Sequence, residues 1–230
     1  MKLVRPPYPV RKLYYSLVWR IPTKEKKIFL TFDDGPIPIV TPWVLDTLEK
    51  HKAKATFFCI GNNIEKHPEV FQQLLAHGHA VGNHTYNHLN GWKTSNDKYF
   101  TNIEKCDSLV KSELFRPPYG KLKRSQLKKI PSLISLLGKE RCPEDREVQS
   151  QISLPIAIGS QSSIIMWDVL SYDYDKTVSP EKCLSNVLQH AREGSIIVFH
   201  DSLKAWTNLE YALPRVLEYF SAKGFRFEAL

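Results

Sequence analysis

The residues of this chain that could bind a metal ion are two histidines and two aspartates. His84 and His88 are four residues apart, a spacing that places both imidazoles on the same side of a helical turn. Two neutral imidazoles and one carboxylate form the usual set of three protein ligands around a catalytic zinc ion, with a fourth position for water. The motif H-E-x-x-H is absent because Thr85 follows His84, so the carboxylates are expected to come from Asp33 and Asp34.

Hydrolysis of an amide is the chemistry that fits these residue types. It needs an activated water, a base for its proton, a group that stabilises the oxyanion and an acid for the departing amine. Bound zinc lowers the pKa of water from about 15.7 to about 7, and one of the two aspartates can act as the base. His200, whose ordinary pKa is about 6.5, can protonate the amine near neutral pH. Asp173 is a candidate for fixing the tautomer of His200.

Short β-like runs alternate with helical patterns along the chain, which is typical of βα units. Strands are expected at 28–32, 55–60, 79–82, 114–116, 163–169, 195–199 and 225–229. Helices are expected from Thr41-Pro42, at 68–77, 97–111 and 124–129, from 179 to near 194, and at 208–222 with a kink or break at Pro214. The pattern predicts a single α/β domain with parallel strands, a distorted or incomplete (β/α) barrel, and a doubly wound open sheet is the alternative.

Ionisable residues follow the predicted strands at the end where both folds place an active site. They are Asp33-Asp34, His84, Arg116, Asp168 with Asp173, and His200-Asp201. Each one singly has a structural explanation, such as a helix cap or a hydrogen-bonded core histidine. Their joint occurrence at strand ends predicts that they converge on one site.

Residues 131–162 interrupt the alternation of strands and helices. They contain a charged cluster followed by a Ser/Gln/Gly-rich stretch, and we predict a surface insertion there.

The formal net charge is +8, and much of the excess lies in the first 27 residues. We interpret residues 1–27 as a basic N-terminal extension that packs on a catalytic domain of residues 28–230, with its charges mainly solvated. No helix-turn-helix, zinc-finger or aromatic RNA-binding pattern accompanies the charge, so no nucleic acid is expected as a partner.

The four cysteines are scattered, and we expect free, mostly buried thiols. No stretch approaches about 20 apolar residues, so no transmembrane helix is expected. The absence of a recognisable signal peptide predicts a cytoplasmic protein, with association with the cell envelope as the alternative. The sequence predicts no particular oligomeric state.

Five segments resemble, in order, the five motifs of the polysaccharide deacetylases, the NodB-homology proteins of carbohydrate esterase family four. They are Thr31–Pro36 (TFDDGP), His84–His88 (HTYNH), Arg116–Gly120 (RPPYG), Trp167–Asp173 (WDVLSYD) and Val198–His200 (VFH). The sequence departs from the family pattern at three positions: Leu170 replaces the first Asp of D-x-x-D-W, Tyr174 replaces its Trp, and Val198 replaces the usual Leu.

The resemblance implies a distorted (β/α) barrel that holds one divalent metal ion, with zinc expected and cobalt, nickel or manganese also suited to such ligands. It makes Asp33 the catalytic base and Asp34, His84 and His88 the metal ligands. Arg116 would orient Asp33.

The resemblance also implies that His200 is the general acid, tuned by Asp173, and that the backbone N–H of Tyr119 helps to hold the oxyanion. The substrates of the family are acetylated amino-sugar polymers and oligomers, such as peptidoglycan and chitooligosaccharides. The residues expected to contact substrate are Pro118, Tyr119, Tyr174 and Trp92. Tyr86 and Tyr172 could add stacking walls, whereas a core position is favoured for Trp43.

Two other functions remain open from the sequence. One is a related metal-dependent amidase that acts on a small non-sugar amide. The other is a catalytically idle, basic protein that binds glycans.

Overall fold

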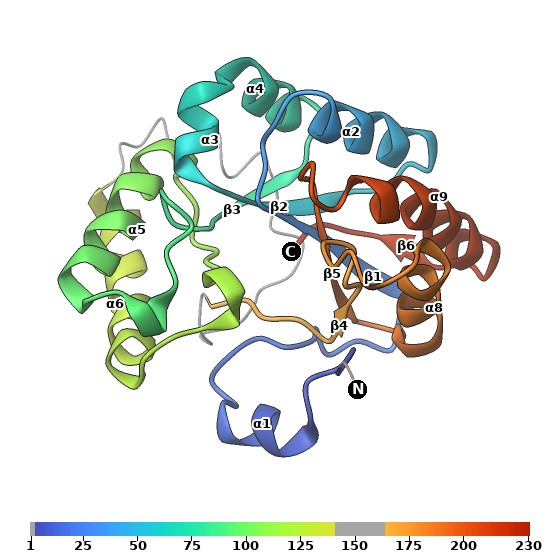
Figure 1. Cartoon of the computed structure of the whole chain (residues 1–230). Coiled ribbons are helices and arrows are strands. Elements are labelled where there is room, and N and C mark those ends of the chain that lie inside the picture. The colour runs from blue at the N-terminus through green and yellow to red at the C-terminus, as the bar shows by residue number, and fades with distance from the viewer. Residues whose placement is uncertain (1–2, 141–163) are drawn as a thin grey trace.

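The computed structural model of the protein describes residues 3–140 and 164–230, and helices encircle its central strands (Figure 1). The strands are β1 (Lys27–Asp33), β2 (Ala55–Cys59), β3 (Ala80–Asn83), β4 (Val169–Leu170), β5 (Ile196–His200) and β6 (Arg226–Phe227). The α-helices are α1 (Tyr8–Leu13), α2 (Val40–Lys50), α3 (Gly61–Lys66), α4 (Pro68–Ala76), α5 (Asn96–Val110), α6 (Arg124–Glu140), α8 (Pro180–His190) and α9 (Trp206–Ala222). Two 3₁₀ turns, η1 (Gly91–Lys93) and η2 (Pro118–Gly120), complete the described elements.

The strands are parallel and follow the order β3-β2-β1-β5-β4, with β6 paired to the beginning of β1. Beyond β3, single-residue bridges link Asn83 to Phe115 and Phe115 to Ile164. The segment from Ile164 then leads into β4, which pairs with β5, so the ring closes. The distorted (β/α) barrel predicted from the sequence is confirmed. Its distortion lies where full strand ladders are replaced by isolated bridges.

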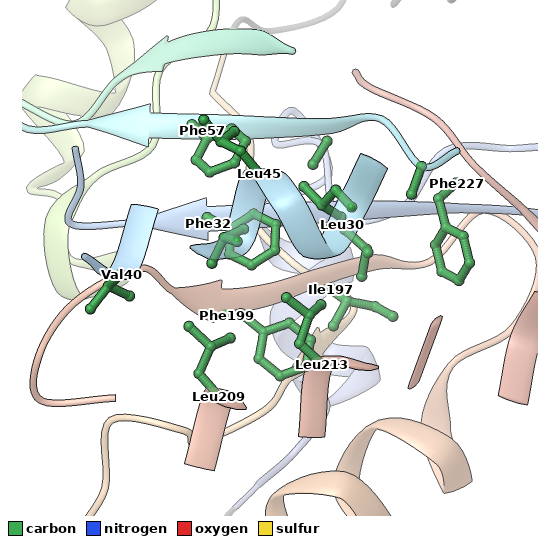
Figure 2. Close-up of a cluster of buried hydrophobic side chains, with 14 of the residues drawn as sticks. Leu30, Phe32, Val40, Leu45, Phe57, Ile197, Phe199, Leu209, Leu213 and Phe227 are labelled. Carbon is green, nitrogen blue, oxygen red and sulfur yellow. The ribbon is translucent and has the colours of Figure 1, made fainter. Parts of the chain in front are cut away.

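Successive side chains of β1 point alternately to the outside and to the interior of the barrel. Leu30 and Phe32 point outward, where they pack with Leu45 of α2 and Leu213 of α9 (Figure 2). The ring of Phe32 stacks on that of Phe57, with centroids 4.9 Å apart. The intervening residues of β1 therefore face the barrel interior.

The inward-facing apolar residues form a separate cluster at the centre of the barrel. It contains Val18, Ile21, Phe29, Phe58, Leu114, Ile165, Ile196 and Leu230. The N–H of Leu230 donates a hydrogen bond to Thr56 Oγ1 near the beginning of β2. This packing fills the barrel below the strand ends.

Leu213→Ala is expected to lower the free energy of unfolding by about 2–5 kcal/mol, because Leu213 is fully buried and the smaller side chain leaves a cavity. Urea denaturation followed by circular dichroism measures the change. Leu203→Ala removes the same atoms from a side chain that is 72% exposed, and its expected effect is within about 0.5 kcal/mol. Equal effects of the two substitutions would contradict the assignment of Leu213 to the core.

Several boundaries differ from the sequence-based expectations. Helix α2 begins at Val40, with Ile39 rather than Thr41 at the N-cap position, so it has no side-chain cap. Thr41 lies inside the helix, where its hydroxyl donates to Asp201. Of the kink or break expected at Pro214, a break is absent, because helix α9 continues through this residue. Helix α3 was not predicted. The strand expected at 163–169 is reduced to bridges at Ile164 and Ile165, followed by the two residues of β4.

The predicted surface insertion is wrong for its first ten residues. Helix α6 runs through Pro131 to Glu140, and Leu133 and Ile134 are buried against Phe115 and Ile164 in a second core cluster. These apolar positions were obscured by the proline and by the charges that follow. The rest of the predicted insertion lies outside the described residues.

Cys59, Cys106 and Cys183 are buried free thiols, whereas Cys142 lies outside the described residues. Among the helices described, none is both long and apolar enough to cross a membrane.

Candidate active site

Asp34, His84 and His88 come together just beyond β1 and β3. One ligand atom from each residue lies within 4.8 Å of the other two. His88 Nε2 is 3.2 Å and His84 Nε2 is 3.8 Å from Asp34 Oδ1. Asp34 Oδ1 is buried, and no hydrogen bond within the described residues satisfies it. Three lone-pair donors at these separations fit a divalent cation with bonds of about 2 Å.

The imidazole of His84 is held in an orientation that suits a metal ligand. Its Nδ1 lies 2.7 Å from the carbonyl oxygen of Arg116, to which Nδ1–H donates, so Nε2 is left for the metal. Burial lowers the pKa of His84 to about 4, even though the charge of Asp33 acts in the opposite direction. The neutral imidazole required for metal binding is therefore the stable form at neutral pH.

Asp34 is ionised in this site. Burial opposes its ionisation, but the neighbouring imidazoles of His88, His200 and His84 lower its pKa overall. The carboxylate form is the one that binds a cation.

The expected helical turn between the two histidines is wrong. His84–His88 form a loop, in which Thr85 and His88 have φ angles of 60° and 54°. Asn83 Oδ1 accepts a hydrogen bond from the Thr85 N–H, and Thr85 Oγ1 accepts one from the Leu89 N–H. These bonds fold the loop so that the two rings lie 5.1 Å apart. The two imidazoles, four residues apart, are brought together by left-handed backbone in the loop and not by the periodicity of a helix.

Asp34 also has a left-handed backbone, with a φ of 83°. Its carbonyl oxygen accepts a hydrogen bond of 2.7 Å from the side chain of Asn63 on α3. Left-handed residues other than glycine cost roughly 1–2 kcal/mol each, and such strain concentrates at functional sites. Asn63 and Asn83 are positioning residues that sequence reasoning missed, and only Asn83, next to His84, had a local signal.

Asp33 ends β1 on the inward face of the barrel, beside the candidate ligand group of Asp34, His84 and His88. Its Oδ1 accepts a hydrogen bond of 2.7 Å from Nη1 of Arg116, which is fully buried. The same guanidinium donates to Thr31 Oγ1 and to the carbonyls of Ile165 and Met166. Arg116 therefore fixes the position of the Asp33 carboxylate, as the prediction for this pair requires.

His200 ends β5, directly beside Asp33 in the register of the two strands. Its Nδ1 lies 2.8 Å from Asp173 Oδ1, and its backbone N–H donates to Asp173 Oδ2. Burial alone would lower the pKa of His200, but the charge and hydrogen bond of Asp173 raise it to about 9. The imidazole is therefore protonated near neutral pH and can deliver a proton.

Three comparisons with known proteins show the family of this chain. A family model described as "Polysaccharide deacetylase" matches residues 20–133. A peptidoglycan-N-acetylglucosamine deacetylase of Bacillus cereus is 32% identical over 216 residues, which are 92% of this chain and 89% of that protein. A chitooligosaccharide deacetylase of Azorhizobium caulinodans is 31% identical, over 79% of this chain and 77% of that protein.

The crystal structure of the Bc1960 peptidoglycan N-acetylglucosamine deacetylase has a TM-score of 0.76 to this chain. The two share 30% identity, over 98% of this chain and 95% of that one. The chain belongs to the polysaccharide deacetylase family. It is a hydrolase of carbon–nitrogen bonds in amides.

The aromatic residues expected to contact the substrate of this deacetylase occupy different environments. Tyr119 is exposed, and its ring lies 4.6 Å from that of His88. Tyr174 is half-buried, with its ring 4.7 Å from that of His200. Pro118, in η2, is buried. Trp92 is exposed on η1, where its indole N–H donates to the carbonyl of Leu122.

Two of the tyrosines suggested to stack on a sugar, Tyr86 and Tyr172, instead make hydrogen bonds within the protein. Tyr86 is buried and its hydroxyl donates to Glu65, while the Tyr172 hydroxyl donates to the carbonyl of Leu3. Trp43 packs edge-on against Trp206 beside the outer core, as expected.

Asp201 supports the turn after β1 of the deacetylase. It accepts hydrogen bonds from the Gly35 N–H and from the Thr41 hydroxyl, and burial raises its pKa to about 8. A Cβ at Gly35 would lie 1.9 Å from Asp201 Oδ2, so only glycine fits there. This contact explains the glycine of the first motif.

Asp168 does not join the site. It precedes β4, and its Oδ2 accepts a hydrogen bond from the hydroxyl of Ser195, which precedes β5. These residues lie at the opposite end of the strands from Asp33 and His200. The expectation that Asp168 follows a strand is wrong because β4 begins one residue later.

Asp173→Asn is expected to shift the pH dependence of the deacetylase. The substitution removes the charge that raises the pKa of His200, so this pKa falls from about 9 toward its ordinary value of about 6.5. A general acid works in its protonated form, so the alkaline limb of kcat against pH should move to lower pH by the same amount. The stabilisation gained from protonated His200 is present below about pH 6.5 and is lost as the pH rises through about 9. An alkaline limb at the same pH in both proteins would argue against His200 as the acid.

Proposed function

We propose that this deacetylase removes N-acetyl groups from N-acetylglucosamine units of peptidoglycan or chitooligosaccharides, with one divalent metal ion held by Asp34, His84 and His88. The observation that carries the proposal is the convergence of this three-residue group with Asp33 and His200. The names of the relatives, peptidoglycan and chitooligosaccharide deacetylases, support the substrate class.

The metal, with zinc expected, would supply a water of lowered pKa and a Lewis acid for the acetyl carbonyl. Asp33 accepts the proton of the attacking water, because Arg116 holds its carboxylate beside the ligand group. His200 donates a proton to the departing amine, with Asp173 keeping the imidazolium in place. The backbone N–H of Tyr119 is assigned to the oxyanion.

The aromatic rings next to His88 and His200 support a sugar substrate. The ring of Tyr119 lies beside His88 and that of Tyr174 beside His200, and pyranose rings pack well on aromatic faces.

Removal of the metal is expected to abolish turnover. The protein is treated with a chelator, dialysed and assayed for acetate release from chitooligosaccharides and from peptidoglycan. Activity should fall by at least about a thousandfold and return with zinc or cobalt. Turnover that survives complete metal removal would exclude the proposed chemistry.

The same assay separates the other two functions. Small non-sugar N-acetyl amides serve as parallel substrates for the metal-loaded protein. Faster turnover of these amides than of chitooligosaccharides would favour the small-amide hydrolase. Glycan binding with no acetate release from any substrate would favour an idle binding protein.

A further inference from the structure

Residues 3–21, here called the N-terminal segment, cover one side of the barrel. The Val4 carbonyl accepts a hydrogen bond from the Leu170 N–H, and Val18 and Arg20 form bridges to Ile165 and Ser195. Helix α1 of this segment lies at the rim of the molecule between α6 and α8 (Figure 1). The segment is thus anchored at both ends while its helix lies at the periphery.

Residues 17–21 of the segment pack inward, but several apolar side chains within residues 3–15 face outward. Helix α1 buries none of its residues, whereas every other α-helix with a described burial pattern packs apolar residues into a core. The large apolar side chains that are exposed here are Leu3 (56%), Tyr8 (68%), Val10 (39%), Leu13 (66%) and Tyr15 (84%). They are five of the eleven such side chains among the described residues, gathered within residues 3–15. This concentration marks an interaction surface.

Positive charge accompanies these apolar side chains. Asp168 is fully buried, and its carboxylate lies 2.7 Å from Arg5 Nη2, 3.3 Å from Arg11 Nη1 and 4.0 Å from Arg192 Nε. One negative charge therefore faces three guanidinium groups, and Arg20 adds a fourth beside Ser195. Burial and the neighbouring charges of Arg5 and Arg20 lower the pKa of Arg192. These four arginines around Asp168, here called the arginine cluster, carry an excess of positive charge.

Two N–H donors of the arginine cluster make no hydrogen bond within the described residues. Arg11 Nε and Arg20 Nε are buried and have no partner within the described part of the chain. Arg5 binds Asp168 through Nε and Nη2. Guanidinium groups bind phosphate oxygens through paired N–H donors. The side chains of Arg5, Arg11 and Arg192 remain 25%, 24% and 45% exposed, so an anionic partner can reach these guanidinium groups.

We propose that the N-terminal segment binds an anionic phospholipid surface, with Tyr8, Leu13 and Tyr15 at the lipid interface and the arginine cluster against headgroup phosphates. The combination of aliphatic and tyrosine side chains with basic ones is typical of interfacial binding. A soluble polyanion would use the charges but would leave Val10 and Leu13 in water.

The placement of the cluster has a consequence for access to the active site. Asp168 and Ser195 precede β4 and β5, whereas Asp33 and His200 end β1 and β5. The arginine cluster therefore lies at the other end of the strands from the catalytic groups. Lipid bound at the cluster leaves the catalytic end free for substrate.

Vesicle flotation tests the proposal on the whole chain. One set of vesicles contains phosphatidylcholine, and the other contains equal amounts of phosphatidylcholine and phosphatidylglycerol. The protein should float with the second set at least about tenfold more strongly, and added salt should release it. The triple variant Tyr8→Ser/Leu13→Ser/Tyr15→Ser should float at least about tenfold less well. Lys12→Gln, at an exposed position of α1, should weaken flotation about fivefold.

Matched control variants lie on helices of the ring other than α1 and its neighbours α6 and α8 (Figure 1). Tyr219→Ser on α9 and Lys66→Gln on α3 remove an exposed aromatic ring and an exposed charge, and flotation should not change. Circular dichroism melting of the triple variant should match that of the parent, which separates lost binding from lost folding.

Three outcomes would overturn the proposal. The first is equal flotation with both vesicle types, or none. The second is tight binding of soluble polyphosphate that the triple variant retains, which would indicate a soluble polyanion. The third is a parent dimer that the triple variant converts to a monomer, which would indicate that a second copy covers this surface.

Discussion

Asp33→Asn is expected to lower kcat by about 10²–10⁴-fold while the protein keeps its full complement of metal. The carboxylate of Asp33 accepts a hydrogen bond from Arg116 and lies beside the ligand group without being part of it. The amide of asparagine has nearly the same shape but cannot accept the proton of the attacking water. Acetate release and metal content, measured on the same preparation, report the two effects separately.

His84→Ala is the informative partner of this variant. It removes one of the three ligands, so metal content and activity should be lost together. Asp46→Asn makes the same chemical change as Asp33→Asn at an exposed position of α2, and neither property should respond. Equal metal loss in the Asp33 and His84 variants would overturn the division between base and ligands.

Arg116→Met is expected to destabilise the protein by about 3–5 kcal/mol and to abolish activity. The guanidinium is fully buried and makes four hydrogen bonds, to Thr31, Asp33, Ile165 and Met166. Methionine fills a similar volume, but it leaves the Asp33 carboxylate and two carbonyl oxygens without these donors. Urea denaturation measures the stability, and acetate release measures the activity.

Arg116→Lys separates the charge from the geometry of the guanidinium. Lysine keeps a positive charge near Asp33 but cannot reproduce the planar set of donors, so it should recover only part of the stability and little activity. A methionine variant as stable and active as the parent would show that the buried ion pair is dispensable.

The sequence-based predictions of the site residues agree with the structure better than the predictions of the surrounding helices and loops. The TFDDGP, HTYNH and RPPYG motifs pointed to residues that the structure brings together, namely Asp33, Asp34, His84, His88 and Arg116, because such motifs depend on residue type and strand-end position. Two local predictions were wrong: the surface insertion after Ile130, where helix α6 continues, and the helical turn between His84 and His88, where the chain forms a loop. A proline and a four-residue spacing are local signals that tertiary contacts override. In the loop, the Asn83 side chain stabilises left-handed backbone that no periodicity indicates.

The sequence alone determined which side chains can do the chemistry and that parallel strands carry them to one end of a barrel. Only the tertiary structure decided that Asp168 lies at the other end, among arginines, and that Asn63 holds the backbone of Asp34. Residue type and strand periodicity are local properties. Which charges share a buried environment depends on contacts between segments more than a hundred residues apart, and these contacts exist only once the barrel has closed.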